Sequence, residues 1–188
     1  QQLPVTWITH SFGARTATTA ICIGPVIRRN AAPRAPVTGR IDRLIGFQAA
    51  FSLLRLSEDR RYFYEDVHFP NGCDRAKSIV LTTSKYDTAT TTILWADLAG
   101  SYRHFKSFCR KNAGTLASCA TVDESGAIEG AYDPRMKLLY LDASGLIRFR
   151  APRTDGGAHS DIFRPAAGRL IWNLMATPPG SAPAPPTP

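Results

Sequence analysis

The clearest element in the pattern of apolar and polar residues is a helix that begins after Ser101. Apolar residues follow it at spacings of three and four, namely Tyr102, Phe105, Phe108 and Cys109. Serine is a residue type that caps the first turn of a helix, and Gly114 stands where a helix end favours glycine. A looser stripe of the same period predicts a second helix within residues 41–54.

Runs rich in β-branched and aromatic residues predict strands in much of the remaining chain. They cover residues 62–69, 78–85, 91–98, 116–122, 137–141 and 146–150. Polar turns around Tyr86-Asp87 and at residues 142–145 join two pairs of these runs and predict two hairpins. Residues 162–163 and 170–175 are expected to form a last strand or a short packing segment. The pattern predicts an α+β fold, in which an antiparallel sheet built from hairpins packs against one or two helices.

The 188 residues suit one domain with poorly structured segments around it. Residues 1–23 are expected to be an N-terminal segment joined to the core, and residues 41–176 a single α+β domain. Residues 24–40 hold four arginines and three prolines without apolar periodicity, and predict an exposed loop. Residues 177–188 predict a Pro-rich disordered C-terminal tail. The first residue is glutamine, so we interpret the chain as a processed product, with its signal peptide removed, or as a fragment.

The four cysteines stand at wide and irregular spacings, and none of them forms a Cys-x-x-Cys pair. Two disulfides are the favoured interpretation, and four buried thiols of a cytosolic protein are the alternative. Four cysteines allow three pairings. We favour Cys109 with Cys119, which closes a short loop, and Cys22 with Cys73, which fixes the N-terminal segment. Disulfides favour a secreted protein.

The chain is basic, with a formal charge of +8, and 18 of its 23 basic residues are arginine. An Arg-rich surface could bind a nucleic acid or another anionic surface, because the guanidinium binds phosphate and carboxylate groups with two hydrogen bonds. The alternative is that a GC-rich genome has raised the arginine, alanine, glycine and proline contents together. No apolar run is long enough to span a membrane.

No strong catalytic motif is present in the sequence. There is no Gly-x-Ser-x-Gly elbow, no P-loop, no His-Glu-x-x-His and no dinucleotide-binding fingerprint. The four histidines lie far apart in the sequence, so we expect no metal site and no cofactor.

Residues 61–82 hold a candidate catalytic group made of Glu65, His68 and Arg75. A carboxylate, an imidazole and a guanidinium are the components of a metal-free ribonuclease, in which a base and an acid move protons while arginine stabilises the phosphorane. The order of Tyr64-Glu65 and Asp74-Arg75 resembles the guanyl-specific fungal ribonucleases. That resemblance implies a ribonuclease-like fold, with or without RNA-cleaving activity.

The general form of the chain resembles the small secreted effector proteins of plant-pathogenic fungi, especially those of smut type. The resemblance is carried by the start at Gln1, the four scattered cysteines, and a compact middle between an Arg/Pro-rich and a Pro-rich segment. It implies a non-enzymatic, secreted virulence protein that binds a host or partner protein, and some effectors of this kind act inside host cells. This is the leading hypothesis from the sequence. A ribonuclease and an Arg-driven binder of nucleic acid or anionic surfaces are the alternatives.

Overall fold

The computed structural model describes residues 3–23, 40–56, 73–91, 97–130, 132–148 and 157–177. Within them the chain has an α+β fold around a six-stranded mixed sheet with the strand order β1-β2-β3-β6-β4-β5. The strands are β1 (Thr6–His10), β2 (Ile41–Phe47), β3 (Ala76–Thr83), β4 (Ala117–Val122), β5 (Ile128–Glu129) and β6 (Leu138–Asp142). Every neighbouring pair is parallel except β4 with β5.

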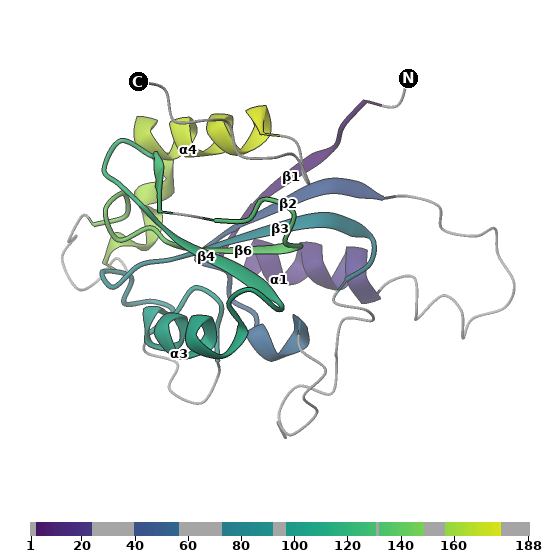
Figure 1. Cartoon of the computed structure of the whole chain (residues 1–188). Helices are drawn as coiled ribbons and strands as arrows, with labels where there is room; N and C mark the ends of the chain where they lie inside the picture. The colour runs from purple at the N-terminus through teal and green to yellow at the C-terminus, as the bar shows by residue number, and fades with distance from the viewer. Residues whose placement is uncertain are drawn as a thin grey trace, which may run out of the picture.

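Helices cover both faces of this sheet (Figure 1). Helices α1 (Phe12–Thr18) and α3 (Tyr102–Asn112) lie on one face, and α4 (Pro165–Ala176) lies on the other. Each face has its own apolar core. Leu44 of β2 belongs to the core beneath α1 and α3, whereas the next residue, Ile45, belongs to the core beneath α4. The central strands of the sheet are therefore buried between two layers of helices.

The antiparallel sheet of hairpins predicted from the sequence is wrong. The strands predicted at 78–85, 116–122 and 137–141 do form, as β3, β4 and β6, but β3 pairs in parallel with β2 and β6. At the expected second hairpin, Leu146 N and Ile147 N both donate to Ala143 O, which makes a helical turn. The chain therefore leaves the sheet after β6, and residues 146–148 form no strand beside it. Most of the run at 91–98 lies outside the described residues.

The helix predicted within residues 41–54 is also wrong, because this segment forms β2 and then the 3₁₀ helix η2 (Leu53–Leu56). β2 is covered on both faces, and all its residues but one are buried. Such a strand has an almost continuous apolar sequence, which periodicity alone does not distinguish from a helix. The packing segment expected at 170–175 is part of α4, in which Leu170 and Leu174 are buried one turn apart.

The helix predicted after Ser101 is confirmed as α3, with Ser101 preceding its first residue and Gly114 in the left-handed conformation beyond its end. Both favoured cysteine pairings are confirmed as well. Cys22 of the π-helix η1 (Thr19–Ile23) is bonded to Cys73, and Cys109 of α3 is bonded to Cys119 of β4.

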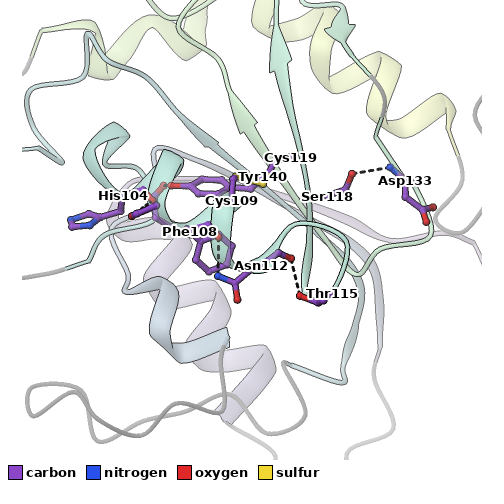
Figure 2. The surroundings of a disulfide bond; sticks show 11 residues. His104, Phe108, Cys109, Asn112, Thr115, Ser118, Cys119, Asp133 and Tyr140 are labelled. Carbon is purple, nitrogen blue, oxygen red and sulfur yellow. Dashed lines mark hydrogen bonds between the residues drawn. A yellow bond between two sulfur atoms is a disulfide. The ribbon is translucent and has the colours of Figure 1, made fainter.

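Figure 2 shows the second disulfide beside the buried ring of Tyr140, which Phe108 meets edge-on. The phenol of Tyr140 donates a hydrogen bond of 2.7 Å to Ala99 O, in the segment that leads into α3. Covalent, aromatic and hydrogen-bond contacts therefore hold α3 on the sheet together.

Three expectations concern segments that lie largely outside the described residues. These are the strand at 62–69, the Arg/Pro-rich loop at 24–40 and the Pro-rich tail at 177–188. Among the described helices, none has the length and apolar character that crossing a membrane requires.

Candidate active site

The carboxyl ends of β1, β2, β3 and β6 meet at one edge of the sheet, because these strands are parallel neighbours. Ligands and substrates of parallel sheets usually bind at this edge, where the loops after the strands come together. Three chemically active side chains lie in those loops. They are Ser11 directly after β1, Asp87 in the loop after β3, and His159 in the 3₁₀ helix η5 (Ala158–Phe163).

Ser11 forms by itself the turn between β1 and α1. Its φ of 53° and ψ of −126° are rarely adopted by a residue other than glycine, and such a conformation costs about 1–3 kcal/mol. Three backbone hydrogen bonds hold it: Ser11 N donates to Phe47 O (3.0 Å), and Ser11 O accepts from Ala14 N and Ala50 N (3.1 Å each). A strained serine between a strand and a helix is the geometry of a nucleophile elbow.

Asp87 and His159 form a buried pair, with 3.0 Å between Asp87 Oδ2 and His159 Nδ1. The Asp87 side chain is completely buried, and 15% of the His159 side chain is exposed. Asp87 also accepts hydrogen bonds from Ala89 N (2.9 Å), Thr90 N (3.3 Å) and Thr90 Oγ1 (2.7 Å). Because the carboxylate accepts the Nδ1 proton, the neutral ring of His159 presents an unprotonated Nε2, as a general base does.

The loop of Asp87 and the segment of His159 are joined through their backbones as well. Ala158 N donates to Tyr86 O (3.1 Å), and the preceding residue, Gly157, has a φ of 66°. A Cβ atom on Gly157 would lie 2.7 Å from Tyr86 O, so only glycine fits this approach. The Asp87–His159 contact is therefore fixed by backbone packing around it.

His10 brings the His159 segment to the end of β1. His10 Nε2 lies 2.9 Å from His159 O, and the centroids of the two imidazole rings are 4.4 Å apart with 45° between their planes. Burial, and next the neighbouring His159, hold the pKa of His10 below its usual value. Ser11 follows His10 directly, so the serine and the Asp87–His159 pair share one corner of the sheet. The Ser11 hydroxyl makes no hydrogen bond with the described residues, and such contacts often tighten only when substrate binds.

The sequence did not reveal this group, because the segment around Ser11 departs from the Gly-x-Ser-x-Gly pattern at one position. Residues 9–13 read Thr-His-Ser-Phe-Gly, which is Gly-x-Ser-x-Gly with threonine in the first place. Thr9 is accommodated because its hydroxyl donates to Ile45 O on β2 (3.0 Å). The sequence indicated no elbow, whereas the backbone of Ser11 has the conformation of one.

Of the three residues predicted to be catalytic, Glu65 and His68 lie outside the described residues, and Arg75 lies within them. Arg75 directly precedes β3, at the amino end of the strand, and its carbonyl accepts from Ile41 N (3.0 Å). Arg75 therefore lies where the parallel strands begin, whereas Ser11 lies where they end. No group of three or more metal-ligating residues occurs in the described part of the chain.

Comparison with protein-family models, with curated proteins and with solved structures found no match. The geometry at the carboxyl edge is therefore the basis on which function is inferred.

Proposed function

We propose that the chain carries the active site of a serine hydrolase, with Ser11 as nucleophile, His159 as general base and Asp87 as the residue that orients His159. The observation that carries the proposal is the buried Asp87–His159 pair beside a serine held in the elbow conformation. The residues occur in the order Ser, Asp, His along the chain, on loops after parallel strands. That is the order and placement of the triad in the α/β-hydrolase fold.

In this mechanism Ser11 Oγ attacks the carbonyl carbon of an ester or a related acyl substrate, and His159 Nε2 takes the hydroxyl proton. The tetrahedral intermediate collapses when His159 returns that proton to the leaving oxygen, and an acyl group remains on Ser11. Water then attacks the acyl group with His159 again acting as base, which releases the acid and restores the serine. Asp87 keeps Nδ1 protonated and stabilises the imidazolium that forms in each step.

The oxyanion of the tetrahedral intermediate requires N–H donors that face the position of the substrate oxygen. In an elbow one donor is the backbone N–H of the residue after the nucleophile, here Phe12. Phe12 N is the first amide of α1, where an N–H has no acceptor within the helix. We therefore assign Phe12 N as an oxyanion donor.

Secretion is compatible with this proposal, because the two disulfides are of the kind that persist in an oxidising compartment. The expectation of a non-enzymatic binding protein is its competitor. The two hypotheses differ in one property that can be measured directly, the reactivity of Ser11. A hydrolase nucleophile reacts covalently with a fluorophosphonate, whereas an ordinary surface serine does not.

The test uses the purified full chain with a fluorophosphonate probe and with p-nitrophenyl butyrate as substrate. We expect labelling at Ser11, identified by mass spectrometry of the modified peptide, and both labelling and hydrolysis should vanish in Ser11→Ala. His159→Gln should lower both by about 10³-fold or more.

Ser125→Ala is the matched control, because Ser125 lies in the exposed turn before β5 and, among the described residues, hydrogen-bonds to Asp123 and Arg169. It should behave as wild type. Folded wild-type protein that is neither labelled nor active would overturn the proposal and favour the binding protein.

A further inference from the structure

We infer that His10 is a positioning residue of this site, one that sets the distance between nucleophile and base by hydrogen bonding to the backbone of His159. The inference rests on the proposed function, since it concerns the same Ser11 and His159. It adds a fourth residue, with a role that differs from the roles of the other three.

The hydrogen bond defines which form of His10 acts. A backbone carbonyl only accepts, so His10 Nε2, 2.9 Å from His159 O, must carry the proton. The neutral ring with its proton on Nε2 supplies this donor, and burial, which lowers the pKa of His10, favours the neutral ring. The site therefore contains two imidazoles in different environments. His159 is paired with a carboxylate, and His10 is paired with a carbonyl.

His159 is consequently held from two strands. Asp87, after β3, fixes Nδ1 of the ring, and His10, the last residue of β1, fixes the carbonyl of the same residue. Since Ser11 is covalently bonded to His10, the second contact ties the base to the strand that carries the nucleophile. A nucleophile and a base must meet within hydrogen-bond distance, and a displacement of about 1 Å can lower a rate about 100-fold.

Ring packing contributes separately from the hydrogen bond. The rings lie 4.4 Å apart, so a second positive charge beside the His159 imidazolium would be strongly unfavourable. The charged and titratable groups identified around His10 are His159 and Asp87, and their charges act in opposite directions on the pKa of His10. A neutral His10 is thus compatible with the cationic His159 that the reaction requires.

Three variants separate the hydrogen bond from the packing. His10→Gln keeps an N–H donor at a similar reach, His10→Phe keeps a ring without a donor, and His10→Ala removes both. We expect kcat to fall about tenfold or more in His10→Phe and His10→Ala, while KM changes less than about twofold. In His10→Gln, kcat should recover substantially toward the wild-type value. If His10 only filled space in the structure, His10→Gln, which keeps an N–H donor but has no ring, would not restore kcat.

A second measurement does not depend on catalysis. The Nδ1 proton of His159, bonded to Asp87, should give a resolved downfield signal in ¹H NMR of wild type and His10→Gln. The signal should broaden by exchange in His10→Phe and His10→Ala. Equal kcat values in all three variants, together with an unchanged signal, would overturn the role of His10.

Failure of the proposed function is distinguishable from failure of this inference. Wild-type protein without fluorophosphonate labelling would overturn the hydrolase, and the NMR signal would then decide alone whether His10 fixes His159. If the wild type and all His10 variants were labelled at the same rate, and the NMR signal did not change, the hydrolase proposal would be retained. The positioning role of His10 would then be rejected.

Discussion

His159 Nδ1 lies 3.0 Å from Asp87 Oδ2, although 72 residues separate the two in the chain. The Asp87 side chain is completely buried, and each other hydrogen-bond donor to its carboxylate comes from the loop directly after it. The carboxylate is therefore held by its own loop as well as by His159, and it gives the distant imidazole a fixed partner.

Replacing Asp87 by asparagine should abolish most of the activity while the fold is kept. An asparagine that donates its amide hydrogens to the ring favours the wrong tautomer of His159, and such a change lowers kcat by about 10³–10⁴-fold. Steady-state kinetics on p-nitrophenyl butyrate would measure this loss. Asp123→Asn is the control, since Asp123 accepts similar local hydrogen bonds from Ser125 and Ala127 in an exposed turn. If both variants lose the same activity, the assignment of Asp87 is wrong.

Thermal stability should fall as the pH is lowered from about 7 to 5, partly because of His10. Burial and His159 lower its pKa in the folded state, whereas in the unfolded chain it protonates near pH 6.5. Between these two pKa values the unfolded state binds more protons, so the free energy of unfolding decreases as the pH falls through this window. His10→Gln should reduce the difference in Tm between pH 7.5 and 5. An equal or steeper decline in the variant would contradict this account.

Removal of the two disulfides should cost unequal amounts of stability. Cys22–Cys73 spans 51 residues and Cys109–Cys119 spans 10, for which loop-closure entropy gives about 4 and about 3 kcal/mol respectively. Urea unfolding of the Cys22→Ser/Cys73→Ser and the Cys109→Ser/Cys119→Ser double variants would measure both. The native protein should also weigh about 4 Da less than its fully reduced form. A larger loss for the shorter loop would show that factors other than chain entropy dominate.

Gly100→Ala should be strongly destabilising, whereas Gly13→Ala should be tolerated. A Cβ atom on Gly100 would lie 2.5 Å from the backbone carbon of Gln48, at the end of β2. Overpacking of this kind costs about 1–3 kcal/mol. At Gly13, in α1, a Cβ atom would meet nothing within 4 Å, and alanine is the better helix former by about 1 kcal/mol. Chemical denaturation of the two variants would show opposite shifts, and a loss in both would refute the steric explanation.

Elements with a local signal could be predicted from the sequence. Ser101 and the apolar stripe after it identified α3, and β-branched runs identified β3, β4 and β6. The parallel pairing could not be predicted, because it depends on contacts between distant segments such as Ile8 with Ile45 and Val80 with Leu139. β2 was mistaken for a helix because two helical layers bury both its faces.

In the candidate site, too, a local sequence pattern could be recognised, whereas contacts between distant segments could not. A relaxed search for serine between a strand and a helix would have found Ser11, since the departure from the known pentapeptide is a single threonine. The meeting of Asp87, His159 and His10 has no local signal. Only the parallel topology brings the loops after β1 and β3 to one corner, and that topology was predicted incorrectly.

β1 is one of the two edge strands of the sheet within the described residues, and it is the strand that ends at the proposed nucleophile. Trp7 and Ile8, on its opposite faces, are 40% and 50% exposed, so little apolar burial holds it to β2. Edge elements with few buried contacts open locally at a lower free energy than the centre of a fold. On heating, inactivation should therefore precede global unfolding, and hydrogen exchange should be fastest near Thr6 and Ile8. The catalytic serine would then be the first part of the site to lose its geometry, while Asp87 and His159 are still in contact.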